Sequence, residues 1–328
     1  MIFLTGGSGL LGLHILAHLR SRGDSVLALA RTPARAGRLA ARGAETLQGD
    51  VADPATWQQV RGVTAIIHSA AVIVSPEGWD TYERINVGAT RLAAQRARDL
   101  GVPLIHISSV AVYGADAGEQ PPGTVAEDYP IGPRGAGDRY ARSKRLAEDV
   151  VREEMTRGLV AVMLRPCVVY GAGDRLFLPG IVRHARRGFF PLVGPGRAPL
   201  PIVHAANVAA AVAVTLGNPA AGGRVFNVTN DGELTGLEFV AGLAAGLGRP
   251  VRAVHLPAGA ARGLATVGDR VRGIFGPPFP SFRASVRFLE GGNPFTSAAL
   301  VRDLGWAPVV PHREALPAAV RDAAAPDA

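Results

Sequence analysis

The sequence of 328 residues contains one cysteine, Cys167, which leaves no partner for an internal disulfide and fits a reducing compartment. It also lacks an apolar run of about 18 residues, the length that crosses a bilayer as a helix. The first residues, MIFLT, show neither the basic segment nor the cleavage site of a signal peptide. We therefore expect a cytoplasmic protein without a membrane-spanning segment.

Lysine is nearly absent, because Lys144 is the only one among 35 lysines and arginines. The arginines produce a formal net charge of +8, which would suit a nucleic-acid partner. They are scattered along the chain without long runs, however, so we expect no nucleic-acid binding. With 48% hydrophobic residues, the chain can build one large core, or a large domain and a smaller one.

Histidine and cysteine do not form a convincing metal or nucleophile pattern. Of the eight histidines, only His14 and His18 have a spacing that suits a shared helix face, and no acidic partner accompanies them. Cys167 lies in an apolar run with no base nearby in the sequence, which is typical of a small core or pocket residue. We therefore predict no metal site and no cysteine nucleophile.

A glycine-rich turn opens the chain. Residues 1–5 are a short apolar run, residues 6–12 read GGSGLLG, and residues 13–20 have helical spacing. A strand, a glycine turn and a helix in this order can bring backbone N–H groups and a helix N-terminus to a phosphate. An ordinary glycine turn is the alternative, but its place at the start of an alternating pattern favours a cofactor site. The spacing is GxxGxxG rather than the commoner GxGxxG, from Gly6, Gly9 and Gly12.

Further strands alternate with helices along the first third of the chain. The strands are predicted at 25–30, 44–48, 64–68 and 103–107, and the helices between them include 53–61 and 87–100. This alternation predicts an α/β fold with a parallel, doubly wound sheet, in which ligands bind beyond the carboxyl ends of the strands. Small residues at such ends also suit tight turns, but we take as site candidates Asp50, Ala70, Ala71, Ser108 and Ser109.

The end of the second strand carries a basic residue. Dinucleotide sites read the adenosine ribose there, through an acidic residue for NAD or an arginine for the 2′-phosphate of NADP. Here the strand is followed by Arg31, without an acid, and Arg35 and Arg38 come next. Arg31 could simply point to solvent, but the pattern favours NADP.

The segment 138–158 is predicted to form one helix, with Asp138 as its N-cap and Gly158 as its C-cap. Tyr140 and Lys144 are four residues apart, so they project from the same face. An ammonium group can lower the pKa of a neighbouring phenol, and it can donate hydrogen bonds to a ribose. The alternative is an exposed surface pair.

The order of these motifs resembles the extended short-chain dehydrogenase/reductase superfamily, the NAD-dependent epimerase/dehydratase superfamily, over nearly the whole chain. The resemblance implies a Rossmann sheet with a smaller C-terminal substrate-binding subdomain. The matching stretches are residues 5–12, Asp50-Val51, 68–71, 86–90, 108–114 (SSVAVYG), 140–144 (YARSK) and 164–171 (LRPCVVYG).

The resemblance also implies a role for each matching residue. Tyr140 would be the general acid/base, Lys144 would hold the nicotinamide ribose and lower the pKa of Tyr140, and Ser109 would hydrogen-bond the substrate oxygen. Hydride transfer would belong to the cofactor, NADP in preference to NAD, while the protein orients the reactants. The implied cofactor contacts are Gly6, Ser8, Gly9, Leu10, Gly12, Arg31, Asp50, Val51, Ala70, Ala71, Ser108, Tyr140, Lys144 and Pro166.

Residues 1–170 are predicted to form the cofactor domain, to which the chain returns at 201–230, while 171–200 and 231–328 form the substrate subdomain. Within the latter we expect a loop or short hairpin at 191–201, a helix capped by Thr235, a short helix capped by Thr296, and disorder from 324 onward. A lid over the substrate is predicted at 257–292, although its phenylalanines could be ordinary core: Phe275, Phe279, Phe282 and Phe288.

Departures from subfamily patterns indicate the substrate. Ser109-Val110-Ala111 stands where nucleotide-sugar dehydratases have Thr-Asp-Glu, Cys167 stands where epimerases have Asn, and 198–201 lacks the arginine that grips a diphosphate. The chain is most similar to the 3β-hydroxysteroid dehydrogenase and dihydroflavonol reductase-like branch. We therefore predict interconversion of a secondary alcohol and a ketone on a bulky apolar small molecule. The alternatives are a nucleotide-sugar epimerase and a non-catalytic NADP sensor, and a homodimer is possible.

Overall fold

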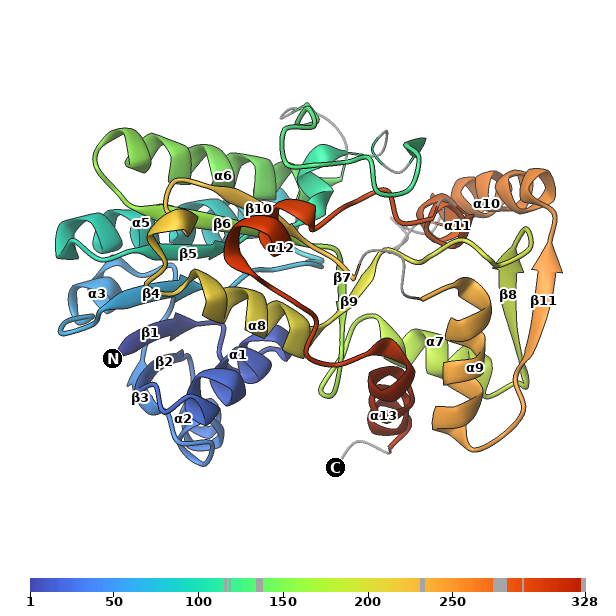
Figure 1. Ribbon diagram of the computed structural model, residues 1–328, viewed down its shortest axis with the longest axis horizontal. Helices are drawn as coiled ribbons and strands as arrows, with labels where there is room; N and C mark the ends of the chain where they lie inside the picture. Colours follow the sequence, from blue (N-terminus) through green and yellow to red (C-terminus); the bar gives the residue numbers. More distant parts are fainter. Residues whose placement is uncertain are drawn as a thin grey trace.

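The computed structural model describes residues 1–114, 117, 119–133, 138–230, 234–273, 282–290 and 292–325. Its central element is a sheet of seven parallel strands in the order β10-β6-β5-β4-β1-β2-β3 (Figure 1). The predicted doubly wound parallel sheet is therefore confirmed. The strands are β1 (Ile2–Thr5), β2 (Val26–Ala30), β3 (Glu45–Gln48), β4 (Ala65–His68), β5 (Leu104–Ile107), β6 (Ala161–Pro166) and β10 (Val225–Val228).

Helices cover both faces of this sheet, so its strands can be apolar on both sides. On β1, Ile2 and Leu4 belong to one core, whereas Phe3 points to the other and meets Trp57 edge-on, with ring centroids 5.6 Å apart. The strand order reverses between β1 and β4, which places the crevice of a doubly wound sheet at their carboxyl ends. One face is covered by α1 (Leu10–Ser21), α2 (Pro33–Ala40) and α8 (Ala205–Thr215), and the other by α3 (Pro54–Gln58), α5 (Ala89–Leu100) and α6 (Arg139–Thr156).

The sequence-based boundaries are close to the observed ones. The four strands predicted after the glycine turn end where expected and begin one residue later than expected. The helix predicted from residue 87 starts at Ala89, after α4 (Trp79–Tyr82) and a π-helical segment, Glu83–Gly88. The predicted cap of α6 is confirmed, because the Asp138 carboxylate accepts a hydrogen bond from the backbone N–H of Tyr140 at 2.9 Å.

A second core lies beyond the carboxyl ends of the large sheet (Figure 1). Its members include Leu178, Leu192, Phe239 and Leu316. The predicted cap of its central helix is confirmed, since Thr235 and Glu238 form a capping box. The elements that contribute are α7 (Leu178–Ala185), β8 (Phe189–Val193), α9 (Gly236–Leu247), β11 (Arg252–Leu256) and α13 (His312–Ala324).

The predicted loop or hairpin at 191–201 is wrong at its start. Phe189–Val193 is strand β8, and it pairs in parallel with β11, which lies far along the chain. Phe190 and Leu192 are buried on one side of β8, where Phe190 packs against Phe239 with ring centroids 5.9 Å apart. The glycines and prolines that follow β8 suggested a turn, while the partner strand could not be identified from local sequence.

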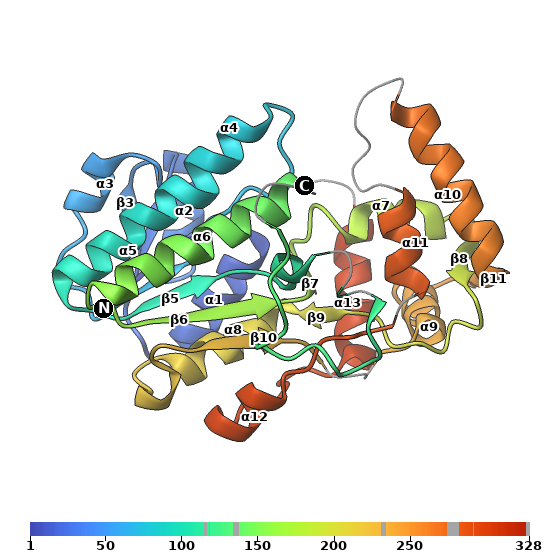
Figure 2. The same ribbon diagram turned by 90° about the horizontal axis from the view of Figure 1, so that it is seen from above.

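Two helices pack together within the region predicted to be a lid, α10 (Ala258–Gly273) and α11 (Phe282–Glu290). Figure 2 shows them at the end of the molecule that is remote from α3 and β3. Phe288 is half-buried and contacts Phe177 edge-on, with ring centroids 5.7 Å apart. Phe275 and Phe279 lie outside the described residues, as does the side chain of Phe282. A covering role for these helices stays a prediction.

The chain returns to the large sheet near its C-terminus. Leu300, on α12 (Ala298–Leu304), and Trp306 belong to the core beside β10 and α8. Ser297 is the N-cap of α12, and the predicted cap, Thr296, accepts a hydrogen bond from the backbone N–H of Ala298 at 3.1 Å. The boundary between cofactor domain and substrate subdomain at residue 231 stays a prediction. Residues 298–306 lie on the substrate side of that boundary in sequence, but they pack against the main sheet.

Helix α13 has no counterpart among the predicted elements. Pro317 lies inside it, although proline usually breaks an α-helix because it has no backbone N–H to donate. The helix continues to Ala324, so the disorder expected from residue 324 is not observed at 324 and 325, whereas 326–328 lie outside the described residues. Among the helices that the structure describes, none is long and apolar enough to cross a membrane.

Helices α9 and α13 approach each other closely at two glycines. A Cβ atom added to Gly246 would lie 2.5 Å from Cβ of Val320 and 2.8 Å from the Pro317 carbonyl oxygen. A Cβ atom on Gly242 would lie 2.5 Å from Cδ2 of Leu316. Glycine at these two positions allows α13 to pack closely against α9.

Replacing Gly246 by alanine should lower the free energy of unfolding by about 1–3 kcal/mol, because overpacking must shift the α13 backbone. The matched control is Gly263→Ala on α10, where the added Cβ meets nothing within 4 Å. That change should be neutral or stabilising by up to about 1 kcal/mol. Chemical denaturation of both variants is the measurement, and equal stability of the two would contradict this account of the α9–α13 contact.

Candidate functional site

The glycine turn lies between the carboxyl ends of β1 and β4. Gly6 has φ +71°, and an added Cβ would lie 2.7 Å from the backbone nitrogen of Ala70. An added Cβ on Gly12 would lie 2.1 Å from the Gly6 carbonyl oxygen. Gly9 is exposed and begins α1, and no side chain caps that helix end. The first N–H groups of α1 are therefore free of a side-chain cap and can donate hydrogen bonds to a phosphate, for which Gly9 leaves space.

Thr5 and His68 support the glycine turn through hydrogen bonds at the ends of β1 and β4. The Thr5 hydroxyl lies 3.0 Å from Nδ1 of His68, and it accepts a hydrogen bond from the backbone N–H of Ala70 at 3.2 Å. His68 stacks on His106 with ring centroids 5.8 Å apart. Burial lowers the pKa of His68 to about 3, with a smaller effect from the Lys144 charge, so the imidazole is neutral at pH 7.

The remaining predicted cofactor residues line the same edge of the sheet. Arg31 is exposed directly after β2, and Asp50 is half-buried after β3, where it accepts a hydrogen bond from Ala52 N–H at 2.9 Å. The Val51 carbonyl accepts from the Trp57 indole at 2.8 Å. Ser8 and Leu10 flank Gly9, Ala70 and Ala71 follow β4, and Pro166 ends β6. These residues suit a dinucleotide laid across the strand ends, although their contacts stay predictions.

Helix α6 carries Tyr140 and Lys144 on the face that meets the strand ends. The Lys144 ammonium is buried, donates to the Ile107 carbonyl at 2.7 Å, and lies 6.0 Å from the centroid of the Tyr140 ring. Burial lowers the pKa of Lys144 to about 8, while the charge of Glu148 opposes that change. The ammonium is therefore fixed at the end of β5, one helical turn from the phenol.

Ser109 follows β5 and hydrogen-bonds the Tyr140 phenol. The predicted lowering of the Tyr140 pKa is wrong for this arrangement, because burial raises it to about 12, only partly offset by the Ser109 hydrogen bond. Lys144 does not oppose the effect of burial here, since its ammonium is directed to the Ile107 carbonyl. The three predicted catalytic side chains are nevertheless brought together, with Tyr140 in its protonated form at pH 7.

Two buried polar groups near this site make contacts that the sequence did not predict. The Asn86 amide donates to the Val72 carbonyl at 2.9 Å and to the Ser143 hydroxyl at 2.8 Å, which ties the segment after β4 to α6. The Ser108 hydroxyl does not face the strand-end crevice but donates to Glu148 at 2.6 Å. A cofactor contact of Ser108 would therefore involve its backbone. Asn86, which was assigned no role from the sequence, could have been suspected as a polar residue inside an apolar segment.

Histidine and cysteine contribute no metal site within the described ranges, where no three His, Cys, Asp or Glu side chains are grouped to hold an ion. His14 instead packs edge-on against His204, with ring centroids 5.3 Å apart, and contacts the Ala172 carbonyl at 3.3 Å. Cys167 is buried directly after β6. Both observations agree with packing roles.

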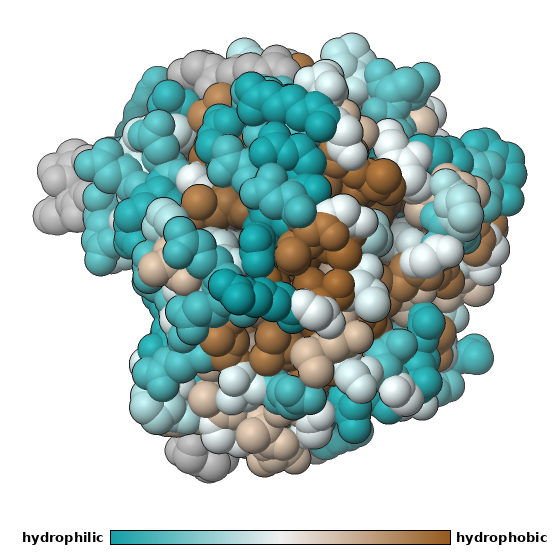
Figure 3. Space-filling view, turned by 90° about the vertical axis from the view of Figure 1, so that its left-hand side faces the viewer, coloured by the Kyte–Doolittle hydropathy of each residue, from teal (hydrophilic) through white to brown (hydrophobic). Residues whose placement is uncertain are grey.

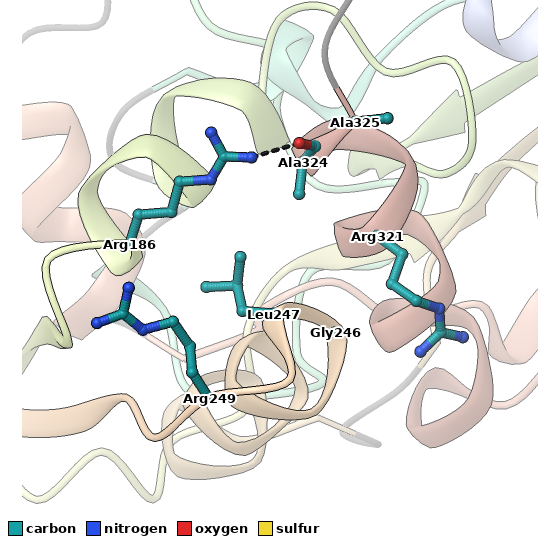
Figure 4. A pocket seen from close by; sticks show the side chains of 7 residues that line it. All are labelled: Arg186, Gly246, Leu247, Arg249, Arg321, Ala324 and Ala325. Carbon is teal, nitrogen blue, oxygen red and sulfur yellow. Dashed lines mark hydrogen bonds between the residues drawn. The ribbon is translucent and has the colours of Figure 1, made fainter.

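Two hollows lie away from these residues. One, of about 380 Å³, is found where α7, α9 and α13 end (Figure 4). There Arg186 donates to the Ala324 carbonyl, and Arg321 points away from the hollow. Arginines at the negative ends of helices complement the helix dipoles, so this cluster has a structural explanation.

The other hollow lies where β5 and β6 begin, at the opposite edge from Tyr140, and is lined by residues such as Val102, Pro103, Leu159 and Val160. Figure 3 shows that side of the molecule, with apolar side chains gathered near its centre. Neither hollow contains a predicted catalytic residue, so the strand-end constellation remains the candidate active site.

Known proteins are similar to this chain. Residues 2–229 match the model of the NAD dependent epimerase/dehydratase family. A 4-hydroxy-2-methyl-3-oxo-4-farnesyl-3,4-dihydroquinoline-1-oxide ketoreductase of Stigmatella aurantiaca is 29% identical over 96% of this chain and 94% of its own length. A 2-alkyl-3-oxoalkanoate reductase of Stenotrophomonas maltophilia is 32% identical over 76% of each chain.

Among solved structures, MoeE5 in complex with UDP-glucose and NAD superposes with a TM-score of 0.72 at 22% identity, over 98% of this chain and 97% of that one. This likeness supports the fold. Because the family model covers more than half of the chain and both the glycine turn and the helix with Tyr140 and Lys144 are in place, the chain belongs to the NAD-dependent epimerase/dehydratase family of extended short-chain dehydrogenase/reductase enzymes.

Proposed function

We propose that the protein is an NADP-dependent oxidoreductase that interconverts a secondary alcohol and a ketone on a bulky apolar substrate. The observation that carries the proposal is the convergence of Ser109, Tyr140 and Lys144 at the ends of β5 and α6, beside the glycine turn of α1. Such a constellation can orient a carbonyl and deliver one proton, which is what hydride transfer requires of the protein.

When bound, NADPH would supply the hydride, and the residues of this chain would supply the rest. The Ser109 hydroxyl would hydrogen-bond the substrate oxygen together with Tyr140. Because burial raises its pKa to about 12, the Tyr140 phenol is protonated at pH 7 and able to donate its proton to that oxygen. The Lys144 ammonium would hold a ribose hydroxyl near Tyr140.

The choice of NADP rests on the end of β2. Arg31 is exposed there, directly before Thr32, whose hydroxyl caps α2 by accepting from Arg35 N–H at 3.4 Å. An exposed guanidinium at this position can bind a phosphate with two parallel hydrogen bonds. NAD, which is present in the MoeE5 structure, is the alternative cofactor.

The apolar substrate is favoured by the residues at 198–201 and by the relatives. The stretch 198–201 reads APLP, and the preceding Arg197 is exposed, so no arginine of this stretch is placed to hold a diphosphate from within. The Stigmatella ketoreductase is named for a substrate that carries a farnesyl chain. A nucleotide-sugar epimerase remains the second candidate, because MoeE5 binds UDP-glucose. A non-catalytic sensor is disfavoured by the complete Ser109, Tyr140 and Lys144 set.

Replacing Tyr140 by phenylalanine should lower kcat by a factor of roughly 10²–10⁴, because the proton donor is removed while the ring is kept. Binding of NADPH, followed by its fluorescence, should be little changed. The control is Tyr129→Phe, which alters a phenol that packs on Tyr113 outside the constellation. A Tyr140→Phe enzyme with most of the original kcat would refute the proposed acid.

Replacing Arg31 by alanine should weaken NADP(H) binding about tenfold or more and leave NAD(H) binding nearly unchanged, since a charge-assisted hydrogen bond contributes about 1.5–3 kcal/mol. Titration of both cofactors by calorimetry measures the two affinities. Arg61→Ala is the matched control, because Arg61 is also exposed but lies after α3. Equal affinity of the unaltered protein for NADP and NAD would overturn the cofactor assignment.

A 3-ketosteroid should bind more tightly than UDP-glucose. Burying a few hundred Å² of apolar surface at roughly 25 cal/mol per Å² suffices for micromolar affinity after association costs. The diphosphate of UDP-glucose would find few hydrogen-bond donors among apolar side chains. Thermal shift and cofactor absorbance, measured with both compounds and NADPH present, test the order. Stabilisation by UDP-glucose alone would favour the epimerase.

A further inference from the structure

The carboxylate of Glu148 is fully buried one helical turn after Lys144 on α6, so Tyr140, Lys144 and Glu148 share one face of that helix. Arg165 of β6, itself 1% exposed, donates to both carboxylate oxygens, at 2.8 Å from Nε and 2.7 Å from the terminal nitrogen. A paired fork of this kind holds a carboxylate in one orientation.

The same carboxylate reaches the strand end that carries Ser109. The Ser108 hydroxyl donates to Oε1 of Glu148 at 2.6 Å, and Arg152 donates to Oε2 at 2.7 Å. Arg165 also donates to the Tyr113 hydroxyl at 2.8 Å, at the end of the turn that follows Ser109. Glu148 therefore links α6, β5 and β6 through one buried group.

Glu148 is ionised within this network. Burial alone would raise the pKa of its carboxyl, but the hydrogen bonds and charge of Arg165, the Ser108 hydroxyl and the Arg152 charge together lower it. A negative charge consequently lies in the interior close to Lys144, whose ammonium is buried and donates to Ile107.

The other titratable groups facing Lys144 do not offer it a negative charge. His68 of β4 and His106 of β5 have pKa values lowered by burial, so both imidazoles are neutral at pH 7. Tyr140 of α6 is neutral because its pKa is about 12, and Arg165 of β6 is positive and engaged with Glu148. Among these described neighbours, Glu148 supplies the charge that favours the ammonium.

We propose that Glu148, clamped by Arg165, is a positioning residue that keeps Lys144 in its ammonium form and holds the Ser108-Ser109 turn within reach of Tyr140. The inference rests on the proposed function for its catalytic consequence, but its electrostatic part can be tested without turnover.

The lone lysine makes a direct test possible. Because Lys144 is the only lysine in the chain, protein labelled with isotopic lysine has one lysine side-chain signal in NMR spectra. We expect this signal to titrate near pH 8 in the unaltered protein. In Glu148→Gln, which keeps an oxygen for Ser108 but loses the charge, the pKa of Lys144 should fall by about 1 or more.

The matched control is Glu154→Gln. Glu154 is also a fully buried glutamate on α6 and is paired with Arg98 and Arg157, but it lies near the other end of the helix. It should therefore affect folding stability similarly without moving the Lys144 signal. Where Glu148→Gln alone fails to fold, Glu148→Gln combined with Arg165→Met removes both charges of the buried pair, and a smaller fall in the Lys144 pKa is expected, because the opposing charge of Arg165 is lost as well.

Activity provides the second readout. The high-pH limit of kcat should move to lower pH in Glu148→Gln, with kcat reduced more than KM changes, whereas Glu154→Gln should keep the original profile. An unmoved Lys144 titration in a folded Glu148→Gln variant, or equal shifts in both variants, would overturn the proposal. Retained activity of Tyr140→Phe would instead refute the proposed function and leave the Lys144 titration to decide this inference separately.

Discussion

The candidate active site of this protein depends on burying charged side chains of one helix against the ends of a parallel sheet. Lys144, Arg145, Glu148 and Glu154 of α6 are all buried, and a buried charge is tolerated only when it is paired or hydrogen-bonded. Each of them is: Lys144 meets the Ile107 carbonyl, Arg145 donates to the Val112 carbonyl at 2.8 Å, and the two glutamates meet arginines. The partners of Lys144, Arg145 and Glu148 lie on β5, on the turn that follows it and on β6, so these contacts hold α6, and with it the phenol of Tyr140, against the sheet.

Much of the fold follows from local sequence, and the failures have a common cause. The apolar runs that became β2, β3, β4 and β5 are bounded by turn residues, so the local pattern located each of them to within a residue. The pairing of β8 with β11 and the return of Leu300 and Trp306 to the large sheet are contacts between distant segments, which local patterns do not encode. Helix α13 was not predicted; it contains Pro317, and it packs against α9 and α7.

The candidate site also has features that were predicted from the sequence and features that were not. The glycine spacing at the start of the chain predicted a phosphate turn, whereas the roles of Tyr140 and Lys144 were implied by the family resemblance; both elements lie at the strand ends. The acidity of Tyr140 was not predictable, because it is set by burial and by the direction of the Lys144 ammonium, both of which depend on the packed structure. Glu148 stands one helical turn from Lys144, but its partner Arg165 lies on another strand, and only their contact distinguishes it from a surface glutamate.

The near-absence of lysine has a consequence for the surface. The single ammonium side chain is 3% exposed, so the positive charge that the side chains present to solvent is carried by guanidinium groups and histidine. Guanidinium does not lose its proton in accessible alkaline solutions, whereas lysine ammonium does so around pH 10. The electrostatic field around this protein therefore persists into strongly basic solution, where a lysine-rich surface would be discharged. Reagents that acylate amines would find no accessible side chain and would be confined to the chain terminus.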